Sequence, residues 1–377
     1  MKRCIACGAP LWETPLLTLN NMPASAQHMP DASQLGEERG MTLNLCQCMG
    51  CGLVQFDCQP VDYYRDVIRA GGYSKTMVEL RRYQYKHLIE DYHLEGKRFL
   101  EVGCGQGEFL KILEEFPVEA HGIEHNPRLA ELARTQGLDV REGFAESEKT
   151  CFPGGPYDVF LSFNFLEHQP DPNGMLQAIY RNLKNDGIGL ITVPSFEYIM
   201  DHSSYYELIR DHIAYYTFDT LLPLLERNGF QAEECEVINR DTLSVIVKKR
   251  SRMEAGNLLD CCVNLKKEME TYLKYLDAWG KRVAIWGASH QGFTLAATTK
   301  LGKKAGYIID SAPFKQGKFS PASHLPIVAP EYFFEHPVEA IIITAPGYTE
   351  EIALCIREKF GKEIEVRAMR SNHLELI

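Results

Sequence analysis

Residues 97–126, KRFLEVGCGQGEFLKILEEFPVEAHGIEHN, constrain the fold of this chain more than any other segment. A short apolar run, typical of a buried parallel strand, leads into a turn that holds Gly103, Gly105 and Gly107. Glycines let the backbone turn tightly beneath a ligand without a side chain in the way. A helix is expected over residues 108–115, and about twenty residues beyond the turn the next strand ends on Glu124. Because an acid at that place can accept both ribose hydroxyls, the segment predicts a βαβ unit that holds a nucleoside.

The residues around the turn favour S-adenosylmethionine over NAD as that nucleoside. Glu101 precedes the first glycine by two positions, and the resulting E-x-G-x-G-x-G pattern resembles class I methyltransferases rather than the dinucleotide-binding G-x-G-x-x-G. The segments GLDVREGFAE, PYDVFLSFNFLEH and LKNDGIGLITVP look like the third, fourth and fifth strands of the same family. The resemblance implies that the following residues bind the cofactor: Glu101, Gly103, Gly105, Gly107, Glu124, His125, Phe144, Ala145 and Asn164. A structural glycine turn without a ligand is the alternative.

Length and composition exclude several other classes of protein. The chain has 377 residues, which exceeds one ordinary core, so two or three domains are expected. No apolar stretch is long enough to span a membrane, and the N-terminal residues MKRCIACG lack the apolar region of a signal peptide, so a cytoplasmic protein is predicted. The net charge of -11 opposes a general attraction to nucleic acid or to an acidic membrane surface. The expected partner is therefore a small molecule.

The cysteines predict a metal site rather than disulfide bonds. The chain holds 12 cysteines without a secretion signal. Cys4 and Cys7, and again Cys48 and Cys51, form C-x-x-C pairs, and two such pairs can complete a closed tetrahedral shell around a structural Zn²⁺. The gap between the pairs is long for a compact zinc ribbon, so Cys46 or Cys58 remains a possible substitute for one ligand.

These signals predict an α/β protein in three parts. Residues 1–75 form a zinc-binding module, and residues 76–250 form the methyltransferase domain, which an amphipathic helix over residues 75–94 introduces. A helix over residues 254–279 connects it to a third part, residues 251–377, in which KRVAIWGASHQGFTLAA again reads as strand, turn and helix. GASHQG lacks the Lys-Ser/Thr pair of a phosphate loop, so we expect a Rossmann-like domain that has no cofactor of its own and contributes to substrate binding.

Several longer sequence segments resemble those of sugar C-methyltransferases. This resemblance is more specific than the glycine turn, and it covers nearly the whole chain. The N-terminal module matches through CIACG and CMGCGLVQF. GGYSKTM looks like the family's tyrosine-serine segment beside the active site, so the resemblance makes Tyr73 a candidate catalytic residue. The third part matches through GASHQGFTL and IIDSAPFKQGKFSPASHLPIVAPE. The resemblance implies methylation of carbon 3 of a nucleotide-linked 4-keto deoxysugar. Proton removal next to the ketone would give an enolate that attacks the methyl group of S-adenosylmethionine, which requires a base and donors for the enolate oxygen.

The segment DHSSYYELIRDHIAYYT is where the base is expected, because the family carries a Tyr-His-Glu-His-x-x-Tyr-Phe run there. The resemblance makes His212 the base and Asp211 the residue that orients it or shares its proton, and Tyr215 keeps the following aromatic position. Arg210 and Ile209 replace the family's histidine and tyrosine, so one possible enolate donor is lost. Tyr205 or Tyr206 is a candidate to replace it.

His168, in FNFLEHQPDP, is a second histidine expected to face the substrate, because it follows the fourth strand at the edge of the sheet where ligands bind. A structural hydrogen bond to the loop is the alternative. The changed DHIAYY segment leaves an O- or N-methyltransferase for a small or carrier-linked metabolite as a second function, and a non-catalytic zinc protein that binds the cofactor as a third. The sequence leaves open which sugar and nucleotide are used and whether the chain, which can act as a monomer, forms oligomers.

Overall fold

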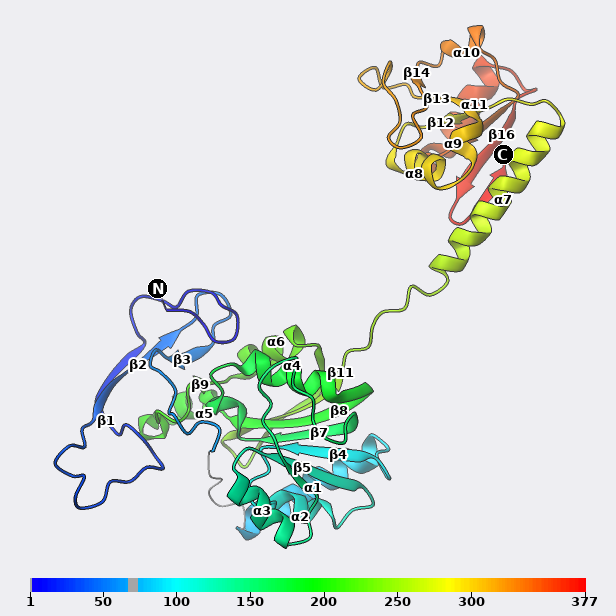
Figure 1. Ribbon diagram of the computed structural model, residues 1–377. Helices are drawn as coiled ribbons and strands as arrows, with labels where there is room; N and C mark the ends of the chain where they lie inside the picture. The colour runs from blue at the N-terminus through cyan, green and yellow to red at the C-terminus, as the bar shows by residue number, and fades with distance from the viewer. Residues whose placement is uncertain (1, 67–73) are drawn as a thin grey trace. The chain divides into compact units, whose positions relative to one another are not determined.

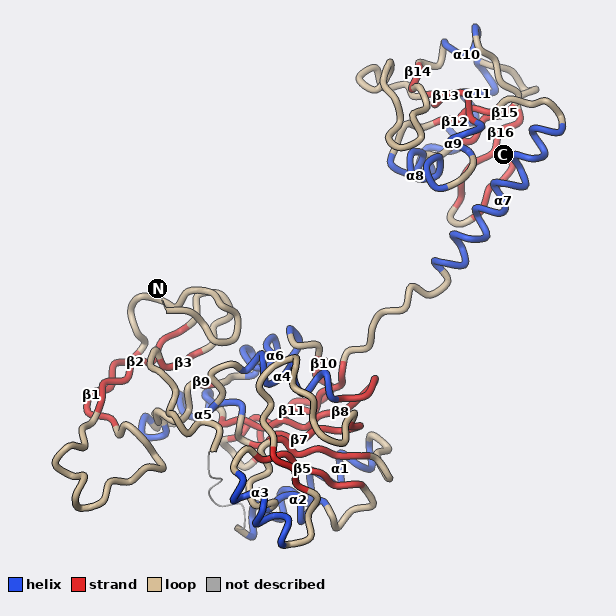
Figure 2. The backbone as a smooth tube through the Cα atoms, in the orientation of Figure 1, coloured by secondary structure: helices blue, strands red, loops and turns tan. Residues whose placement is uncertain are grey.

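The computed structural model describes residues 2–66 and 74–377, and the chain divides into two compact units, Met1–Arg252 and Met253–Ile377 (Figure 1). Each unit contains its own large sheet, with helices on both faces (Figure 2). Tyr73, one of the predicted catalytic residues, lies outside the described residues. No helix in the described part of the chain is long and apolar enough to cross a membrane.

The first unit is built on a seven-stranded sheet of order β10-β11-β8-β7-β4-β5-β6. The strands in this order are β10 (Phe230–Ile238), β11 (Thr242–Lys249), β8 (Leu183–Pro194), β7 (Tyr157–Phe163), β4 (Arg98–Val102), β5 (Glu119–Glu124) and β6 (Val140–Glu142). Only β11 runs antiparallel to its neighbours, while β8, β7, β4, β5 and β6 pair in parallel. This confirms the predicted α/β fold, because the parallel strands gather their carboxyl ends at one edge of the sheet.

Two apolar layers cover this sheet. One face carries α1 (Lys75–Asp91), α2 (Glu108–Leu113) and α3 (Pro127–Thr135), whose buried side chains share one core. The other face carries α4 (Pro172–Asn182) and α6 (Phe218–Arg227) (Figure 1). Short segments over the carboxyl ends of the strands, η1 (Leu166–His168), α5 (Phe196–Asp201) and η2 (Tyr205–Glu207), complete this unit.

The N-terminal residues form a four-stranded antiparallel sheet of order β1-β2-β3-β9. Its strands are β1 (Leu17–Met22), β2 (Met41–Gln47), β3 (Val54–Phe56) and β9 (Ala214–Tyr215). Because β9 belongs to the segment that follows η2, the N-terminal sheet includes the stretch in which the base was predicted. Leu43, Leu45 and Phe56 share a core with α4 and α6, so the N-terminal residues and the methyltransferase sheet fold as one unit.

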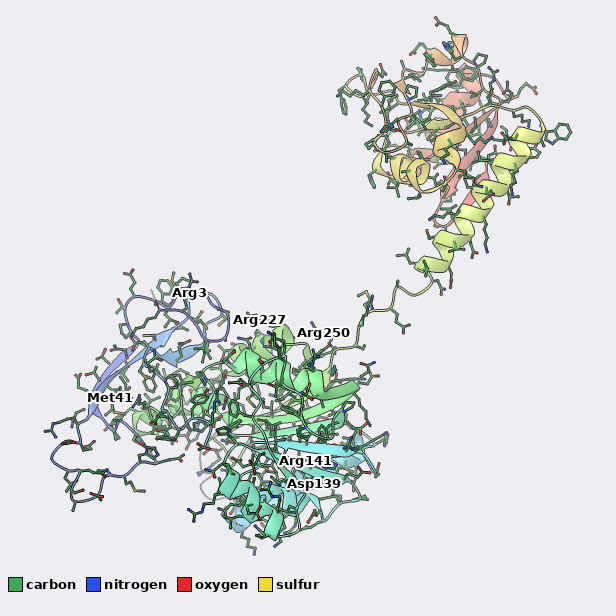
Figure 3. The ribbon with its side chains drawn as sticks, in the orientation of Figure 1. Arg3, Met41, Asp139, Arg141, Arg227 and Arg250 are labelled. Carbon is green, nitrogen blue, oxygen red and sulfur yellow. The ribbon has the colours of Figure 1, made fainter. Side chains whose placement is uncertain are left out.

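Polar contacts fasten the N-terminal residues to these helices. Arg227, labelled in Figure 3, extends from α6 and donates to the carbonyl of Ala6 at 2.8 Å. The Asn173 amide, at the start of α4, donates to the same carbonyl at 2.9 Å and to that of Ile5 at 3.1 Å. The first cysteine pair therefore sits against the amino end of α4 and the carboxyl end of α6.

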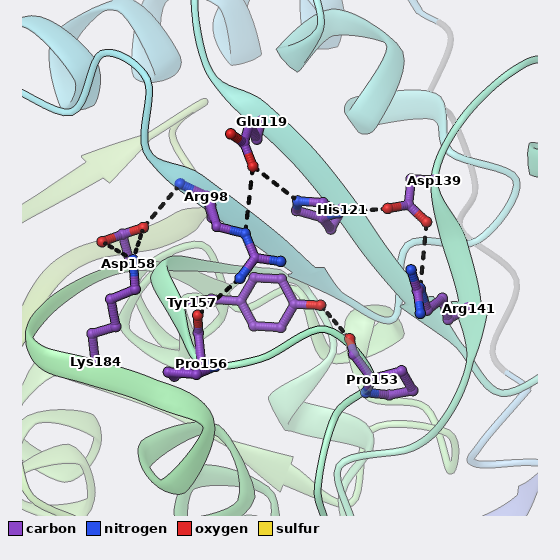
Figure 4. Close-up of polar contacts among 10 residues, drawn as sticks. All are labelled: Arg98, Glu119, His121, Asp139, Arg141, Pro153, Pro156, Tyr157, Asp158 and Lys184. Carbon is purple, nitrogen blue, oxygen red and sulfur yellow. Dashed lines mark hydrogen bonds and ion pairs between the residues drawn. The ribbon is translucent and has the colours of Figure 1, made fainter.

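A network of charged and aromatic side chains closes the opposite, amino-terminal edge of the parallel strands (Figure 4). His121 lies 2.7 Å from Asp139, and the backbone N–H of Arg98 donates to Asp158 at 3.1 Å. Lys184 pairs with the same Asp158 at 2.9 Å. These contacts fix the strand starts and leave the carboxyl edge open for ligands.

The second unit contains a six-stranded sheet of order β14-β13-β12-β15-β16-β17, parallel except for β17. The strands are β14 (Ile327–Val328), β13 (Ala305–Ile309), β12 (Val283–Trp286), β15 (Ala340–Ile343), β16 (Glu365–Arg370) and β17 (His373–Leu376). One face packs against α7 (Leu258–Ala278), α8 (His290–Thr298) and α9 (Leu301–Lys304), and the other against α10 (Tyr332–Glu335) and α11 (Thr349–Lys359), which η3 (Pro346–Tyr348) precedes. The predicted connector helix thus begins four residues later than expected and packs through its C-terminal half, where Met269, Tyr272, Leu273 and Leu276 are buried.

Candidate active site

The glycine turn between β4 and α2 has the geometry expected of a cofactor loop. Gly103, Gly105 and Gly107 have φ of 73°, 59° and 84°, in the left-handed region that favours glycine. A Cβ at Gly107 would collide with the Leu138 side chain, so glycine is also required there for packing. The glycines therefore let the backbone turn tightly at the carboxyl end of β4.

Glu124, at the end of β5, accepts hydrogen bonds from backbone groups of this turn. The Gly105 N–H donates to one carboxylate oxygen at 2.9 Å, and the Asn126 N–H donates to the other at 2.8 Å. The acid is 5% exposed, so its carboxylate is fixed in position before any ligand arrives. Glu101, near the end of β4, is fully buried.

The expected adenine region lies next to Glu124. A small cleft there is lined by Glu124, His125, Phe144, Ala145 and Phe165, among others. The His125 and Phe144 rings meet edge to face with centroids 5.6 Å apart, and Arg65 lies over Phe144 at 5.0 Å. Both predicted residues, Phe144 and Ala145, are therefore at this end of the site.

Asn164 marks the other end of the turn. It follows β7 directly with φ of 46°, a conformation that asparagine tolerates better than most residues. Its side-chain oxygen accepts from the Thr192 hydroxyl at 2.8 Å. Asn164 lines a cavity together with Gly103 and Gly105, which places it where the amino acid part of a nucleoside cofactor is expected.

This cavity has a volume of about 480 Å³, and it lies at the carboxyl edge of the parallel strands. Ligand sites of open α/β sheets occur at this edge, and the volume is in the range of small-molecule pockets. The cavity is lined by the N-terminal loop, α1, the glycine turn, the start of α2, the end of β7 with the residues after it, the segment before β9, and the β10-β11 hairpin. The cavity thus joins the cofactor turn to the predicted catalytic residues.

His168 and His212 come together in the wall of this cavity. Their rings meet edge to face with centroids 4.7 Å apart, although they are 44 positions apart in the sequence. His168 is 5% exposed, and its Nδ1 lies 2.8 Å from the backbone carbonyl of Asp211. Because a carbonyl only accepts, Nδ1 carries the proton and Nε2 keeps its lone pair. His168 thus makes the structural hydrogen bond that was the alternative, and it also lines the cavity.

Both imidazoles are neutral at neutral pH. Burial lowers the pKa of His168 to about 4, and burial together with the neighbouring His168 lowers the pKa of His212 to about 3. Each ring can therefore accept a proton without first losing one.

These shifts predict loss of stability in acid. The unfolded chain binds protons on the two histidines below about pH 6.5, whereas the folded chain does so only near 4 and 3. Stability is therefore complete above about 6.5 and should fall by roughly 1.4 kcal/mol per histidine for each pH unit below it, until the folded pKa is reached. Urea unfolding at a series of pH values will test this. His212→Asn should flatten the slope, and an unchanged slope would contradict the assignment.

The carboxylate of Asp211 contacts the N-terminal loop. Among the residues with described positions, it accepts from the Tyr63 hydroxyl at 2.7 Å and from the Ala26 N–H at 3.0 Å, and no contact to the His212 ring is observed. Asp211 thus ties the N-terminal loop to the cavity, and its backbone carbonyl orients His168. Arg210, which replaces a family histidine, donates to the Ala24 carbonyl at 2.8 Å. This hydrogen bond also links the segment before β9 to the N-terminal loop.

Tyr215 also differs from its predicted catalytic role. Its hydroxyl accepts from the Ile209 N–H at 2.8 Å and donates to the Ile209 carbonyl at 3.1 Å, and the residue is 3% exposed. This pair of hydrogen bonds closes the loop that presents His212. Tyr205 and Tyr206, the candidates for the missing donor, are 62% and 73% exposed, and neither is among the described residues that line this cavity.

The sequence reasoning missed several residues of this site. Glu167, adjacent to His168, is 1% exposed and lines the cavity. Arg81 and Asp241 also line the cavity. The Arg81 guanidinium lies 3.5 Å above the Phe163 ring and is 1% exposed. The Glu-His pair was a usable signal for Glu167, whereas nothing in the helical pattern of α1 distinguished Arg81 from the other basic residues of that helix.

The two cysteine pairs converge as predicted. The Cys4 and Cys51 sulfurs lie 3.6 Å apart and those of Cys7 and Cys48 lie 3.4 Å apart, with all four within 4.8 Å of one another. A tetrahedral zinc shell with bonds of about 2.3 Å requires sulfur separations of about 3.8 Å, close to those observed. Cys46 instead directs its sulfur at the Asn44 carbonyl, outside the cluster. The sulfurs therefore fit a closed metal site made by the predicted four residues.

The two pairs are built alike. Gly8 and Gly52 follow the second cysteine of each pair, with φ of 73° and 78°. A backbone hydrogen bond closes each turn, from Gly8 to Cys4 at 2.9 Å and from Gly52 to Cys48 at 3.2 Å. The Gly50 N–H also donates to the Cys48 sulfur at 3.2 Å, as expected around a thiolate ligand.

Comparison with known proteins agrees with this description. Residues 77–234 match the methyltransferase domain family, and residues 259–363 match the family of C-methyltransferase C-terminal domains. The C-methyltransferase NovU of Streptomyces niveus is 22% identical over 384 residues, which cover 93% of this chain and 90% of that protein. The ubiquinone biosynthesis O-methyltransferase of Bordetella avium is 30% identical over 99 residues, covering 25% of this chain and 41% of its own length.

Solved structures resemble the chain over about half its length. A possible histamine N-methyltransferase of Thermotoga maritima covers 47% of this chain and 94% of its own, with 20% identity and a TM-score of 0.36. A protein of Pyrococcus horikoshii covers 50% and 99%, with 16% identity and a TM-score of 0.41.

The sheet order, the glycine turn with its acid and the matched methyltransferase domain define an S-adenosylmethionine-dependent methyltransferase. The chain combines this methyltransferase domain with a match to C-methyltransferase C-terminal domains, and it is similar to one C-methyltransferase along nearly its whole length.

Proposed function

We propose that the protein methylates a carbon atom next to the ketone of a nucleotide-linked deoxysugar. The observation that carries the proposal is the pair of neutral imidazoles, His168 and His212, in the wall of a cavity that also includes the cofactor turn. The full-length similarity to a C-methyltransferase supports it. In this proposal, residues 1–75 form the zinc module, residues 76–250 the methyltransferase domain, and residues 251–377 a Rossmann-like domain that contributes to substrate binding.

In this proposal, different residues contact different parts of S-adenosylmethionine. Gly103 and Gly105 leave space for its amino acid part, Glu124 accepts from the ribose, and Phe144 borders the adenine. Arg81 offers a fixed positive charge in the cavity wall, which suits a carboxylate. When bound, the cofactor supplies an electrophilic methyl group.

The reaction begins with proton removal from the carbon beside the ketone. His212 accepts the proton, the C–H electron pair moves into the new C=C bond, and the carbonyl oxygen becomes the enolate oxygen. The enolate carbon then forms a bond to the methyl group as the S–CH₃ bond breaks and the ketone re-forms. His168, held by Asp211, keeps the His212 ring in place through their edge-to-face contact.

A structural zinc ion completes the proposal. Cys4, Cys7, Cys48 and Cys51 supply four thiolates and leave no open position, so the metal stabilises the fold and takes no part in methyl transfer.

An O-methyltransferase is the second candidate. The specific observation in its favour is Ile209, because an apolar side chain lines the cavity where the family has a tyrosine, and an O-methyltransferase needs no enolate donor. The partial similarity to ubiquinone biosynthesis O-methyltransferases agrees with it.

Hydrogen exchange at the substrate distinguishes the two functions. A nucleotide-linked 4-keto deoxysugar incubated with the enzyme and S-adenosylhomocysteine in D₂O should gain deuterium at carbon 3, because a C-methyltransferase must break that C–H bond. With S-adenosylmethionine, the product should carry a new methyl group on carbon. If a set of keto sugars shows neither exchange nor a carbon-bound methyl group, the proposal is wrong.

A further inference from the structure

Glu167 is a buried carboxyl group in the active-site wall whose role is not explained by the reaction above. It lies in η1, directly before His168, and is 1% exposed. Neither of its side-chain oxygens has a hydrogen-bond partner among the residues that the structure describes, yet the residue lines the cavity. An unsatisfied buried polar group destabilises the folded state, so its retention calls for a functional explanation.

The His168 ring, next to Glu167, does not donate a hydrogen bond to it. Glu167 Oε1 lies 3.8 Å from His168 Nε2, which is longer than a hydrogen bond. The Asp211 carbonyl also holds the His168 proton on Nδ1, so Nε2 presents a lone pair. A carboxylate at this position would receive nothing from that ring, whereas a carboxylic acid has a proton to offer.

Burial is the largest influence on the ionisation of Glu167. Nitrogen and oxygen atoms of Glu167, His168 and His212 lie within 4.8 Å of one another, and both imidazoles are neutral. The ionisable groups of the adjoining elements are Tyr215, Tyr216 and Asp211 near β9 and Arg81 on α1. Burial raises the pKa of Glu167 to about 8, so the group is protonated at neutral pH.

We infer that Glu167, as a neutral carboxylic acid, donates the hydrogen bond that stabilises the enolate oxygen. The inference rests on the proposed function, since it assigns a donor to the same enolate. As His212 takes the proton from carbon, negative charge grows on the carbonyl oxygen, and the Glu167 O–H donates to that oxygen without transferring its proton. The donor is thereby fixed and shielded from water, the arrangement in which such a hydrogen bond is most effective. It takes the place of the family tyrosine, where this chain has Ile209.

Two substitutions of Glu167 distinguish hydrogen-bond donation to the enolate oxygen from the other roles of a carboxyl group. Glu167→Gln keeps an N–H donor of similar shape, while Glu167→Ala removes the donor. Deuterium exchange at carbon 3 should slow by about 10²–10³-fold in Glu167→Ala and by less than about tenfold in Glu167→Gln at neutral pH. Wild-type exchange should fall as the pH rises through about 8, and Glu167→Gln should not show this decline. Glu207→Gln, on exposed η2, is the matched control.

Infrared spectroscopy tests the protonation state without any substrate. With S-adenosylhomocysteine bound, wild type at neutral pH should show the C=O stretch of a protonated carboxylic acid that Glu167→Gln lacks, and calorimetry should give all variants the same affinity for that ligand. An ionised Glu167 at neutral pH overturns the inference, whatever the substrate is.

The exchange rates of the variants also distinguish a hydrogen-bond donor from other roles of Glu167. Equal losses in Glu167→Gln and Glu167→Ala, or wild-type exchange that rises with pH through 8, would make Glu167 a base and overturn the inference alone. A divalent cation bound in addition to the structural zinc, found by metal analysis in the wild type and absent from Glu167→Ala, would make it a metal ligand, with the same consequence. If the wild type exchanges no hydrogen in any keto sugar, the proposed function fails and the donor role fails with it.

Discussion

Replacement of His212 by asparagine is expected to slow methyl transfer by about 10²–10⁴-fold, the usual contribution of a general base. The His212 ring lies at the cavity wall against His168, and the Tyr215 hydroxyl holds the loop that presents it. Asparagine keeps a polar side chain of similar length but cannot accept a proton at neutral pH. Single-turnover measurements with saturating S-adenosylmethionine will report the chemical step directly.

The control for this prediction is His202→Asn. His202 follows α5, is exposed, and its Nδ1 contacts the Tyr198 carbonyl at 2.9 Å. Its replacement should leave the rate unchanged. Because the pKa of His212 is near 3, the wild-type rate should show no decline from protonation of this base between neutral pH and about pH 5. His212→Asn with a nearly wild-type rate and unchanged cofactor affinity would move the role of the base to another group.

The cofactor half of the site could be predicted from the sequence because its contacts are local. Gly105 and Glu124 are 19 positions apart, and one βαβ unit brings them within 2.9 Å. The apolar runs and glycines of that unit determine its geometry without help from the rest of the chain. The cysteine pairs were predictable for the same reason, since each pair is a tight turn with a glycine after it.

The acceptor half depends on contacts that no short pattern reveals. Tyr63 and Asp211 are 148 positions apart, and Ala26 and Asp211 are 185 apart. The motif predicts that Asp211 orients His212 because the two residues are adjacent in the sequence. In the structure, the Asp211 carboxylate contacts Ala26 and Tyr63 of the N-terminal residues. Glu167 was missed for a related reason: its importance comes from burial without a partner, which only the packed structure displays.

Loss of one zinc ligand is expected to have the second large effect, on both stability and activity. Cys48 is 2% exposed, and its sulfur is one of the four in the cluster, 3.4 Å from that of Cys7. Cys48→Ser should remove the bound zinc, detected as one ion per chain in the wild type by metal analysis. Structural zinc sites contribute on the order of 10 kcal/mol of binding free energy, so we expect the unfolding free energy to fall by several kcal/mol.

Activity should fall together with stability because the cysteine cluster and the active site share one fold. The N-terminal residues that supply Ala26 and Tyr63 hold Asp211, and Asp211 orients His168. A loosened module would therefore release the histidine pair, while the glycine turn and Glu124 keep their local geometry. Cys48→Ser should thus bind S-adenosylhomocysteine but lose hydrogen exchange at the substrate. Cys151→Ser, at an exposed cysteine outside the cluster, should change neither property. Full zinc content and wild-type exchange in Cys48→Ser would show that the N-terminal cysteines do not support the active site.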